Sequence, residues 1–506
     1  MDPSFITLSR EVVKHAHGNP LALKVLGCDM FRKDKQAWES ALRKLKDSPH
    51  KDIQNVLKLS YDGLEWRERQ ILLDIACFFK GGWPLHHIEA ILGDAKCAIE
   101  HLKGKCLVIT EGWNKRIEMH DLIRQICEPI VLDEDRWDPR KRSRLWRYED
   151  ILQVLNKPKG AERVEALSLD MSQVSRAIQL SPKVFEEMDN LRLLRIYSMD
   201  ASWYLELPQG LEYLPNTLRL LHWDLYPSPS LPSNFRPDSI VYLKMHESRL
   251  TQLWQGENVR LVNLKVCDLT ESKELVKIMD FSGIPNLEEL DLRGCSSLDE
   301  IPSSIQLCRK LIKIIVWGCV KLRGFPSDLR LTSLEEVNLD NCPRITELPK
   351  LPSTVRNLSF QKSGIKLQVT AAACIGQLIR LEGLFVGEIS EGMLSQIGCL
   401  NCLEGLSFRG GPEVVSIPES TIYNLSRLVI LCCCSCENLE ALPDGIGRLE
   451  RLKTLSLEGC SKIRSLPSDI GGLKILETLS LEGCSKIMSL PSDIGGLKIL
   501  ETLSLE

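Results

Sequence analysis

Hydrophobic residues recur at a regular spacing through the last two-thirds of the chain. The pattern is L-x-x-L-x-L, where L is an apolar residue and x is mostly polar. Its last four positions alternate between apolar and polar residues, which predicts a short strand with one buried face. The intervals run from 21 to 27 residues, and the pattern starts at Val164, Leu191, Leu218, Ile240, Leu264, Leu287, Leu311, Leu334, Val355, Leu381, Leu403, Leu428, Leu452, Leu476 and Leu500.

A period of this length is typical of a leucine-rich-repeat solenoid, in which each repeat forms one coil stacked on its neighbours. In "LEELDL", the repeat that starts at Leu287, the alternation predicts that Leu290 and Leu292 point inward. Fourteen strands about 4.8 Å apart would form a concave face on the order of 65 Å long, which suits a macromolecular partner. The last repeat stops inside its strand, so we expect a solenoid truncated at the C-terminus. The spacing loosens between Val355 and Leu403, which predicts an irregular repeat or a bend.

The polar residues between the inward leucines are the candidates for contact with a protein partner, because they point away from the core. Two strands serve as examples, and their candidate residues are Glu288, Glu289, Asp291, Lys453, Thr454 and Ser456.

Cysteine or serine recurs at one position shortly after ten of the predicted strands. A small polar side chain there would be buried beneath the turn and bond to the backbone of a neighbouring coil. A role in redox sensing is the alternative. No apolar run approaches the roughly 20 residues that span a bilayer, and the N-terminus has no secretory signal, so we expect free thiols in the cytoplasm. The residues are Cys295, Cys319, Cys342, Cys436, Cys460 and Cys484, with Ser172, Ser248, Ser272 and Ser363 in other repeats.

The first 160 residues show helical periodicity instead. "ERQILLDIACFFKGG" predicts an apolar helix that ends at Gly81 and Gly82. "CLVIT" and "RIEM", joined by "EGWNK", predict a β-hairpin, and a further helix begins near His120. Helices followed by a two-stranded wing favour a winged-helix fold. The predicted domains are a helical subdomain at 1–50, a winged-helix subdomain at 51–132, a polar linker at 133–160 and the solenoid at 161–506.

Charge argues against a nucleic-acid surface. Residues 1–160 contain 28 Lys and Arg against 24 Asp and Glu, so the net charge of -4 leaves about -8 for the solenoid, whereas a nucleic-acid-binding surface needs a basic excess. The basic stretch "DPRKRSRLWR" (138–147) has two interpretations. It is either a nuclear-import signal or patch for an acidic partner, or a solvated stretch packed by Leu145 and Trp146, and the second is favoured.

Several blocks together resemble the plant disease-resistance receptors of the TIR–NB-ARC–leucine-rich-repeat class. The blocks are "GNPLALKVLG", "LKLSYDGL", "LLDIACFFKGG", "IEMHDLI", "DPRKRSRLW" and the repeats "L-x-L-x-G-C-x-x-L-x-x-L-P". The resemblance implies an ADP/ATP switch in which Pro20 lies against the adenine. It also implies that Met119, His120 and Asp121 form a motif whose histidine touches the β-phosphate of ADP. Asn19 stands where the family usually has leucine.

The chain also departs from this family. It contains no G-x-x-x-x-G-K-[ST] phosphate loop, no visible Mg²⁺-binding acidic strand and no TIR domain. We therefore expect no enzyme activity, neither ATP hydrolysis nor NAD cleavage, and at best weak binding of ADP or ATP. The alternative of an enzyme, either an ATPase or an NAD hydrolase, would need the phosphate loop, the acidic strand or the TIR domain that this sequence lacks.

The resemblance implies an intracellular innate-immune receptor that senses pathogen-derived or modified host proteins through its repeats. Its partners would be such proteins and an NB-ARC module, its own or another, with no direct nucleic acid and no membrane span. The cytoplasm is the expected location, and the nucleus is a second one. The alternative is a stand-alone interaction scaffold without nucleotide switching.

Overall fold

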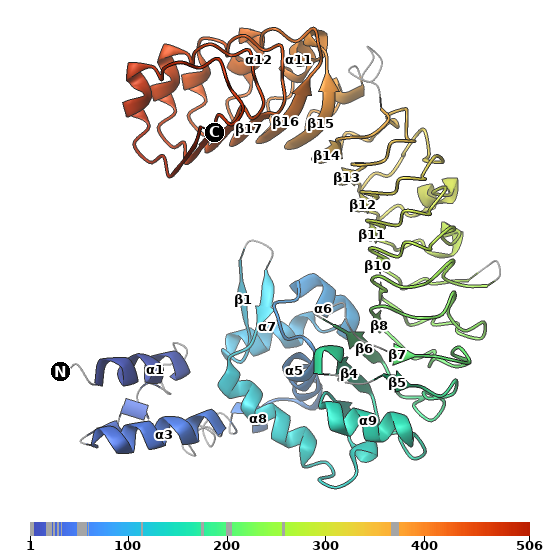
Figure 1. The fold of residues 1–506 in the computed structure, drawn as a ribbon. Coiled ribbons are helices and arrows are strands. Elements are labelled where there is room, and N and C mark those ends of the chain that lie inside the picture. Colours follow the sequence, from blue (N-terminus) through green and yellow to red (C-terminus); the bar gives the residue numbers. More distant parts are fainter. Residues whose placement is uncertain are drawn as a thin grey trace. The chain divides into compact units, whose positions relative to one another are not determined.

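The structure is a computed structural model. It describes residues 5–16, 23, 26–27, 30–31, 33–47, 58, 60–112, 115–173, 177–198, 205–255, 259–365 and 374–505. The chain divides into two compact units (Figure 1). The first comprises Met1–His222 with Ile240–Tyr242, and the second comprises Trp223–Ser239 with Leu243–Glu506. No helix among these described residues is long and apolar enough to cross a bilayer. The division falls within the repeats, whereas the sequence analysis placed a boundary at residue 160.

The first unit begins with two amphipathic helices, α1 (Ile6–Ala16) and α3 (Lys35–Asp47). Their apolar faces meet in a small cluster that includes Val12 and Leu42. The winged-helix elements follow, and the helix from His120 and the hairpin between the two predicted strands are confirmed. They are α5 (Trp66–Phe78), α6 (Leu85–Leu92), α7 (Lys96–Gly104), β1 (Ile109–Glu111), β2 (Arg116–Glu118) and α8 (Asp121–Leu132).

Helix α5 is the core helix of the winged-helix domain. Its residues Ile71 to Phe78 are buried in an unbroken run, as expected for a helix covered on most sides. It starts with a reciprocal capping box between Glu65 and Glu68. Gly81 and Gly82 follow it at φ angles of 88° and 72°, a left-handed backbone that glycine adopts without strain.

The predicted polar linker at 133–160 is wrong, because this segment is folded. It contains a 3₁₀ turn at Pro139–Lys141, strand β3 (Arg144–Leu145) and helix α9 (Tyr148–Asn156). Strand β3 pairs in parallel with β4 (Ala166–Asp170), so the sheet begins before the first predicted repeat. The prediction failed because Arg144, read as a solvated cation, is only 1% exposed and lies within the folded core.

The remaining strands of the first unit are short. The hydrogen-bonded order is β3, β4, β6, β8, and β5 pairs separately with β7. The bounds are β5 (Ile178–Gln179), β6 (Leu193–Tyr197), β7 (Leu205–Glu206) and β8 (Leu220–Trp223), whose last residue belongs to the second unit.

The second unit is a leucine-rich-repeat solenoid. Its strands lie in chain order, each parallel to the next, and the convex side carries turns and short helices (Figure 1). The helices are α11 (Glu391–Ile397) and α12 (Glu419–Asn424). The strands are β9 (Tyr242–Lys244), β10 (Val266–Asp268), β11 (Glu289–Asp291), β12 (Lys313–Ile315), β13 (Glu336–Asn338), β14 (Asn357–Phe360), β15 (Gly383–Ile389), β16 (Gly405–Gly410), β17 (Ile430–Cys433), β18 (Thr454–Ser456), β19 (Thr478–Ser480) and β20 (Thr502–Ser504).

The alternation predicted from the sequence is confirmed in this unit. Leu290 and Leu292 are fully buried, whereas the intervening Asp291 is partly exposed. The irregular region is also confirmed, because the register between β15 and β16 shifts between Phe385 and Glu388. Part of the quoted stretch in this region, residues 366–373, lies outside the described residues.

The ladder of buried thiols is confirmed, and the described cysteines are free. The Sγ atom of Cys319 donates a hydrogen bond to the carbonyl oxygen of Leu292 in the preceding coil, at 3.1 Å. Cys484 and the carbonyl of Leu457 repeat the contact at 3.1 Å, and burial raises the pKa of Cys484 to about 11. A thiol that donates to a neighbouring coil and stays protonated serves structure rather than redox chemistry.

Of the four serines predicted at the equivalent position, only some bond to a neighbouring coil. The Oγ atom of Ser272 donates to the carbonyl oxygen of Met245 at 2.9 Å and bonds to Ser248 at 2.8 Å. Ser172 was wrongly assigned to this position, because it is exposed and bonds to the neighbouring Asp170. Ser363 is half-buried and donates within its own coil, so neither of these two bridges coils.

Candidate functional site

A pocket of about 560 Å³ lies beside the wing in the first unit. Three segments surround it: the loop after α5, the hairpin with its approach, and the start of α8. The structure therefore brings the predicted Met119, His120 and Asp121 together in one site, whereas Pro20 lies outside the described residues. The lining residues are Phe79, Gly81, Gly82, Cys106, Leu107, Val108, Ile109, Glu111, Ile117, Glu118, Met119, His120, Asp121, Ile123 and Arg124.

His120 is the N-cap of α8. Its Nδ1 atom accepts a hydrogen bond from the backbone N–H of Leu122, at 3.1 Å. An imidazole nitrogen that accepts carries no hydrogen, so the ring hydrogen of the neutral side chain is on Nε2. The cap therefore fixes the tautomer and makes Nε2 a donor at the positive end of the helix, where an anion is stabilised.

The charges around His120 are mixed. Asp121 forms an ion pair with Arg124 at 2.9 Å, and Glu111 and Glu118 add two further carboxylates to the lining. The described lining residues include no lysine and no glycine-rich loop of backbone N–H groups. They fit one end of a phosphate group and do not form a complete nucleotide cradle.

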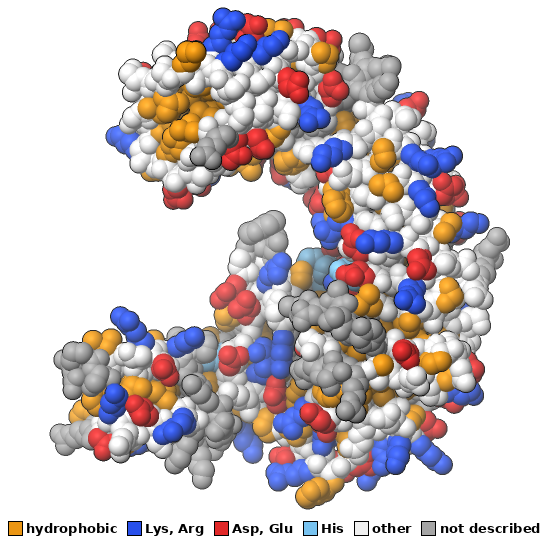
Figure 2. All heavy atoms as spheres, in the orientation of Figure 1, with side chains coloured by type: hydrophobic (Ala, Val, Ile, Leu, Met, Phe, Trp, Pro, Cys, Tyr) orange, Lys and Arg blue, Asp and Glu red, His pale blue; other side chains and the backbone are white. Residues whose placement is uncertain are grey.

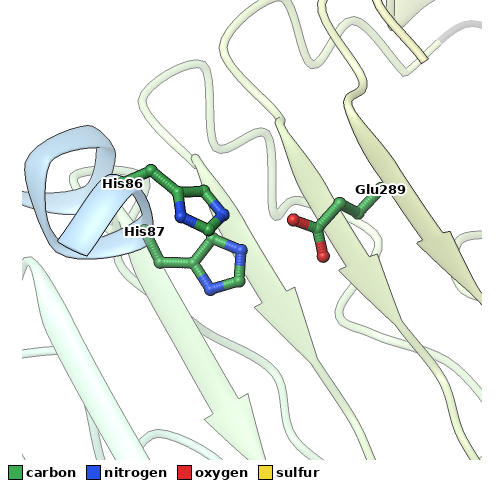
Figure 3. Close-up of side chains that lie close together, drawn as sticks. All are labelled: His86, His87 and Glu289. Carbon is green, nitrogen blue, oxygen red and sulfur yellow. The ribbon is translucent and has the colours of Figure 1, made fainter. Parts of the chain in front are cut away.

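The predicted partner-binding residues of β11 lie on the outward face of the sheet. Glu288, Glu289 and Asp291 are all partly exposed, and Figure 3 shows the Glu289 carboxylate standing off its strand. Two of them are held in place by ion pairs: Glu288 with Lys265 at 2.9 Å and Asp291 with Arg293 at 2.8 Å.

The predicted residues of β18 occupy the same face further along. Lys453 is exposed and pairs with Glu477 of the next coil at 2.6 Å. Thr454 and Ser456 are partly exposed and stand in register with a threonine and a serine in the adjacent strand. The fold thus leaves all six predicted residues outside the core.

Sequence reasoning missed an arginine cluster inside the first unit. Asp74 on α5 is 2% exposed and accepts hydrogen bonds from Arg144 and Arg192, each at 2.8 Å. Arg144 is also buried and donates to the side chain of Gln70 at 2.9 Å. The ion triad joins the core helix of the winged-helix domain to strand β3 and to the residue that precedes β6.

Two more arginines contact the ends of winged-helix helices. Arg195 donates to the carbonyl oxygen of Phe78, the last residue of α5. Arg219 donates to the carbonyl oxygens of Ile91 and Ala90 at the end of α6, at 2.5 and 3.0 Å. Cations are stabilised at helix C-termini, where the last carbonyl groups have no partner within the helix. The sequence signal that could have predicted these contacts is the presence of arginine at outward positions of the early repeats.

Aromatic rings continue this contact region. The Arg195 guanidinium lies over the rings of Trp83 and Tyr197, with 5.3 and 4.3 Å to the centroids. Figure 3 shows His86 and His87 on α6 with their rings side by side, and the centroids are 4.2 Å apart. The His87 ring also meets Tyr242 edge-on at 5.2 Å. The outward face of the first coils is thus occupied by the chain itself.

The basic stretch 138–147 is partly buried in the structure. Arg142 and Arg144 are buried, which contradicts the favoured interpretation of a solvated stretch. Arg142 pairs with Asp150 at 2.7 Å, and Arg140 pairs with Asp138 at 2.8 Å. Lys141 and Arg147 remain exposed, so the import signal and the patch for an acidic partner stay predictions.

We expect a change in acid stability when His246 is replaced by alanine in the second unit. Burial disfavours the charged form of Asp268, but hydrogen bonds from His246 and Thr270 and the charge of Lys244 outweigh it and lower the pKa of Asp268 to about 2. A depressed carboxyl pKa stabilises the fold above the unfolded value of about 3.9, and this contribution is lost as pH falls towards 2.

His246→Ala should therefore raise the pH at which the chain unfolds in acid. Circular dichroism between pH 5 and pH 2 measures this midpoint. Asn263→Ala, which removes an exposed and uncharged side chain, tests whether any polar substitution in this unit has the same effect. An unchanged midpoint in His246→Ala would contradict the role of this pair.

The fold and the site define a class of protein: a winged-helix domain followed by a leucine-rich-repeat solenoid. The family model described as "Disease resistance protein Roq1-like, winged-helix domain" matches residues 65–134, and "Leucine Rich Repeat" matches residues 286–308. Both matches fall where the structure has these elements.

Named relatives identify the family more narrowly. Disease resistance protein RPP2A of Arabidopsis thaliana is 36% identical over 372 residues, 69% of this chain and 28% of that protein. TMV resistance protein N of Nicotiana glutinosa is 32% identical over 450 residues, 88% of this chain and 36% of that protein. Disease resistance protein RUN1 of Vitis rotundifolia is 41% identical over 329 residues, which are 60% of this chain and 24% of that protein. The chain belongs to the plant disease-resistance receptors of this type, and it spans well under half of the length of these relatives.

Proposed function

We propose that the chain acts in plant innate immunity as the sensing and regulatory part of an intracellular disease-resistance receptor. The observation that carries the proposal is the second unit's outward sheet face. Its side chains at Glu288, Glu289, Asp291 and Lys453 are held outside the core by a rigid parallel sheet. A long row of positions that can vary without loss of the fold suits recognition of pathogen-derived or modified host proteins.

The winged-helix pocket supports a regulatory role. The Nε2 hydrogen of His120 and the N-terminus of α8 would hold one end of an ADP phosphate, and Met119 and Asp121 frame that position. The site has mixed charge, so we propose weak binding of ADP or ATP and no catalysis. Bound nucleotide would supply charge to this pocket, and the chain's own contribution is to orient the His120 donor.

A stand-alone interaction scaffold is the second candidate. The observation that favours it is the set of three carboxylates, Glu111, Glu118 and Asp121, around the pocket that a nucleotide phosphate would have to approach. In that case the repeats would bind a receptor or another protein, and His120 would act only as the cap of α8.

Titration of the purified chain with ADP separates these two candidates. For the receptor, we expect a dissociation constant on the order of 1 mM, about −4 kcal/mol, and a further loss in His120→Asn, which keeps a capping side chain. His246→Asn in the second unit is the matched control. Isothermal calorimetry measures the affinity. Equal affinity of the His120 variant and the parent chain would favour the scaffold.

Expression in leaves tests the immune function itself. Joined to the upstream part of a relative such as TMV resistance protein N, the chain should support a defence response, measured as induced cell death or defence transcripts. The same fusion with Leu290→Ala, which weakens the solenoid core, should lose the response. A fusion that is stable yet inactive in every context would contradict the proposal.

A further inference from the structure

Another pocket, of about 670 Å³, lies in the second unit beside the 3₁₀ turn Phe281–Gly283. Its volume is in the range of small-molecule sites. Parts of three segments line it: 252–254 after β9, 259–261 before β10, and 277–284 after β10. These segments lie between strands, so the pocket is separate from the outward sheet face that carries the proposed function.

Trp254 is a buried hydrogen-bond donor in the wall of this pocket. It is 5% exposed, and its Nε1 atom has no hydrogen-bond partner in the part of the chain that the structure describes. Buried indole N–H groups usually find a partner, because a buried donor without one loses the hydrogen bond that it makes to water in the unfolded chain. The N–H of Trp254 therefore needs an acceptor atom, which a ligand in the pocket can supply.

The charged residues of the lining favour an acidic ligand. They are Arg260, Lys277 and Asp280, and neither cation forms an ion pair with another described residue. Asp280 is already engaged, because its Oδ1 atom accepts from the backbone N–H of Ser282 at 2.7 Å. The bridge between Lys277 and Glu300 of the next coil joins their backbones only. In the view of Figure 2, acidic and basic side chains are interspersed over the second unit, so no large region of one sign opposes the two cations.

Close backbone packing holds Arg260 at the pocket. A Cβ atom on Gly283 would lie 2.4 Å from the carbonyl oxygen of Val259 and 3.2 Å from the Cα atom of Arg260, so glycine is what lets these segments meet. The N–H of Leu261 donates to the carbonyl oxygen of Gly283 at 2.9 Å. Val259 and Met279 are half-buried and add apolar surface to the lining. The pocket thus combines a cation on an anchored backbone with apolar walls.

We propose that this pocket binds a small organic acid, in which an apolar body such as a phenyl ring on a short chain ends in one carboxylate. The carboxylate accepts from the Trp254 N–H and pairs with Lys277 and Arg260. Hydrogen bonds to a carboxylate are stronger than those between neutral groups, so this end of the ligand supplies the specificity. The apolar body lies against Val259 and Met279.

Titration of the whole chain with phenylpropionate, followed by NMR spectra of the indole N–H groups, tests the proposal. The chain has 10 tryptophans, and Trp254→Phe identifies the Trp254 signal by its loss. We expect this signal to move downfield and to saturate with a dissociation constant on the order of 1 mM. Lys277→Gln should weaken binding about tenfold, because it removes a charge that pairs with the carboxylate.

Lys273→Gln is the matched control, because Lys273 is an exposed lysine of the same coil outside the pocket lining. Phenylpropanol and phenylpropylamine keep the apolar body without the carboxylate, and both should bind at least about tenfold more weakly. Three results would overturn the proposal: no saturable shift of the Trp254 signal, equal binding of phenylpropanol, or equal affinity of Lys277→Gln and the parent chain. Calorimetry with Lys277→Gln, a change at an exposed position, decides the case if Trp254→Phe does not fold.

Discussion

Replacement of Asp74 by alanine is expected to lower the free energy of unfolding by about 3–5 kcal/mol. Asp74 is 2% exposed and accepts from Arg144, which is 1% exposed, and from Arg192. Without the carboxylate, the buried Arg144 guanidinium would have lost its ionic partner, and its desolvation would no longer be offset. Urea unfolding followed by tryptophan fluorescence measures the change for the first unit.

Two further variants separate the ion triad from ordinary packing. Asp74→Leu combined with Arg144→Met replaces both charges by apolar groups and should cost less than Asp74→Ala alone. Glu382→Ala removes a partner of Arg356 in a pair that is more than one-third exposed on both sides, so its cost should stay within about 1 kcal/mol. Equal losses of unfolding free energy in Asp74→Ala and Glu382→Ala would contradict the claim that burial makes the Asp74 ion pairs more important for stability.

Leu290→Ala should destabilise the second unit by about 2–5 kcal/mol. Leu290 is fully buried at the centre of β11, so truncation removes apolar contacts and leaves a cavity between coils. The adjacent Glu289 is partly exposed on the opposite face of the strand. Glu289→Ala should change stability by no more than about 0.5 kcal/mol.

Hydrogen exchange is the appropriate measurement for this pair of variants. Coils of a solenoid contact only their neighbours, so the loss of protection in Leu290→Ala should be largest in β10, β11 and β12 and fade beyond them. Glu289→Ala should leave the exchange pattern unchanged. A uniform loss of protection from β9 to β20 would show instead that the second unit unfolds as one cooperative body.

The repeat architecture could be predicted from sequence because its determinants are local. Leu290, Leu292 and Cys295 occupy fixed places in a pattern that recurs every 21 to 27 residues, and each coil repeats the same burial. The motif at Met119, His120 and Asp121 could be located for the same reason, since three consecutive residues at a helix start stay together in any fold.

Contacts between distant segments could not be predicted. Arg144 and Arg192 both donate hydrogen bonds to Asp74, from which they are separated by 70 and 118 residues in the sequence. Taken alone, a run of arginines next to a proline predicts a solvated segment. Pairing decides whether such cations are buried, and pairing is a property of the tertiary structure. The walls of the wing pocket could not be predicted for the same reason, because only the tertiary structure brings Gly82 and Glu111 into one pocket with His120.

The near-identical stretches 456–475 and 480–499 show how such a chain can grow. The strands beside them pair without a shift, Thr454 with Thr478 and Thr478 with Thr502, and equivalent residues recur after 24 positions. Duplication of 24 codons therefore adds one complete coil to the solenoid and lengthens the row of outward positions by about 4.8 Å. Unequal recombination in the gene can then add outward-facing surface one coil at a time, while the existing coils keep their contacts.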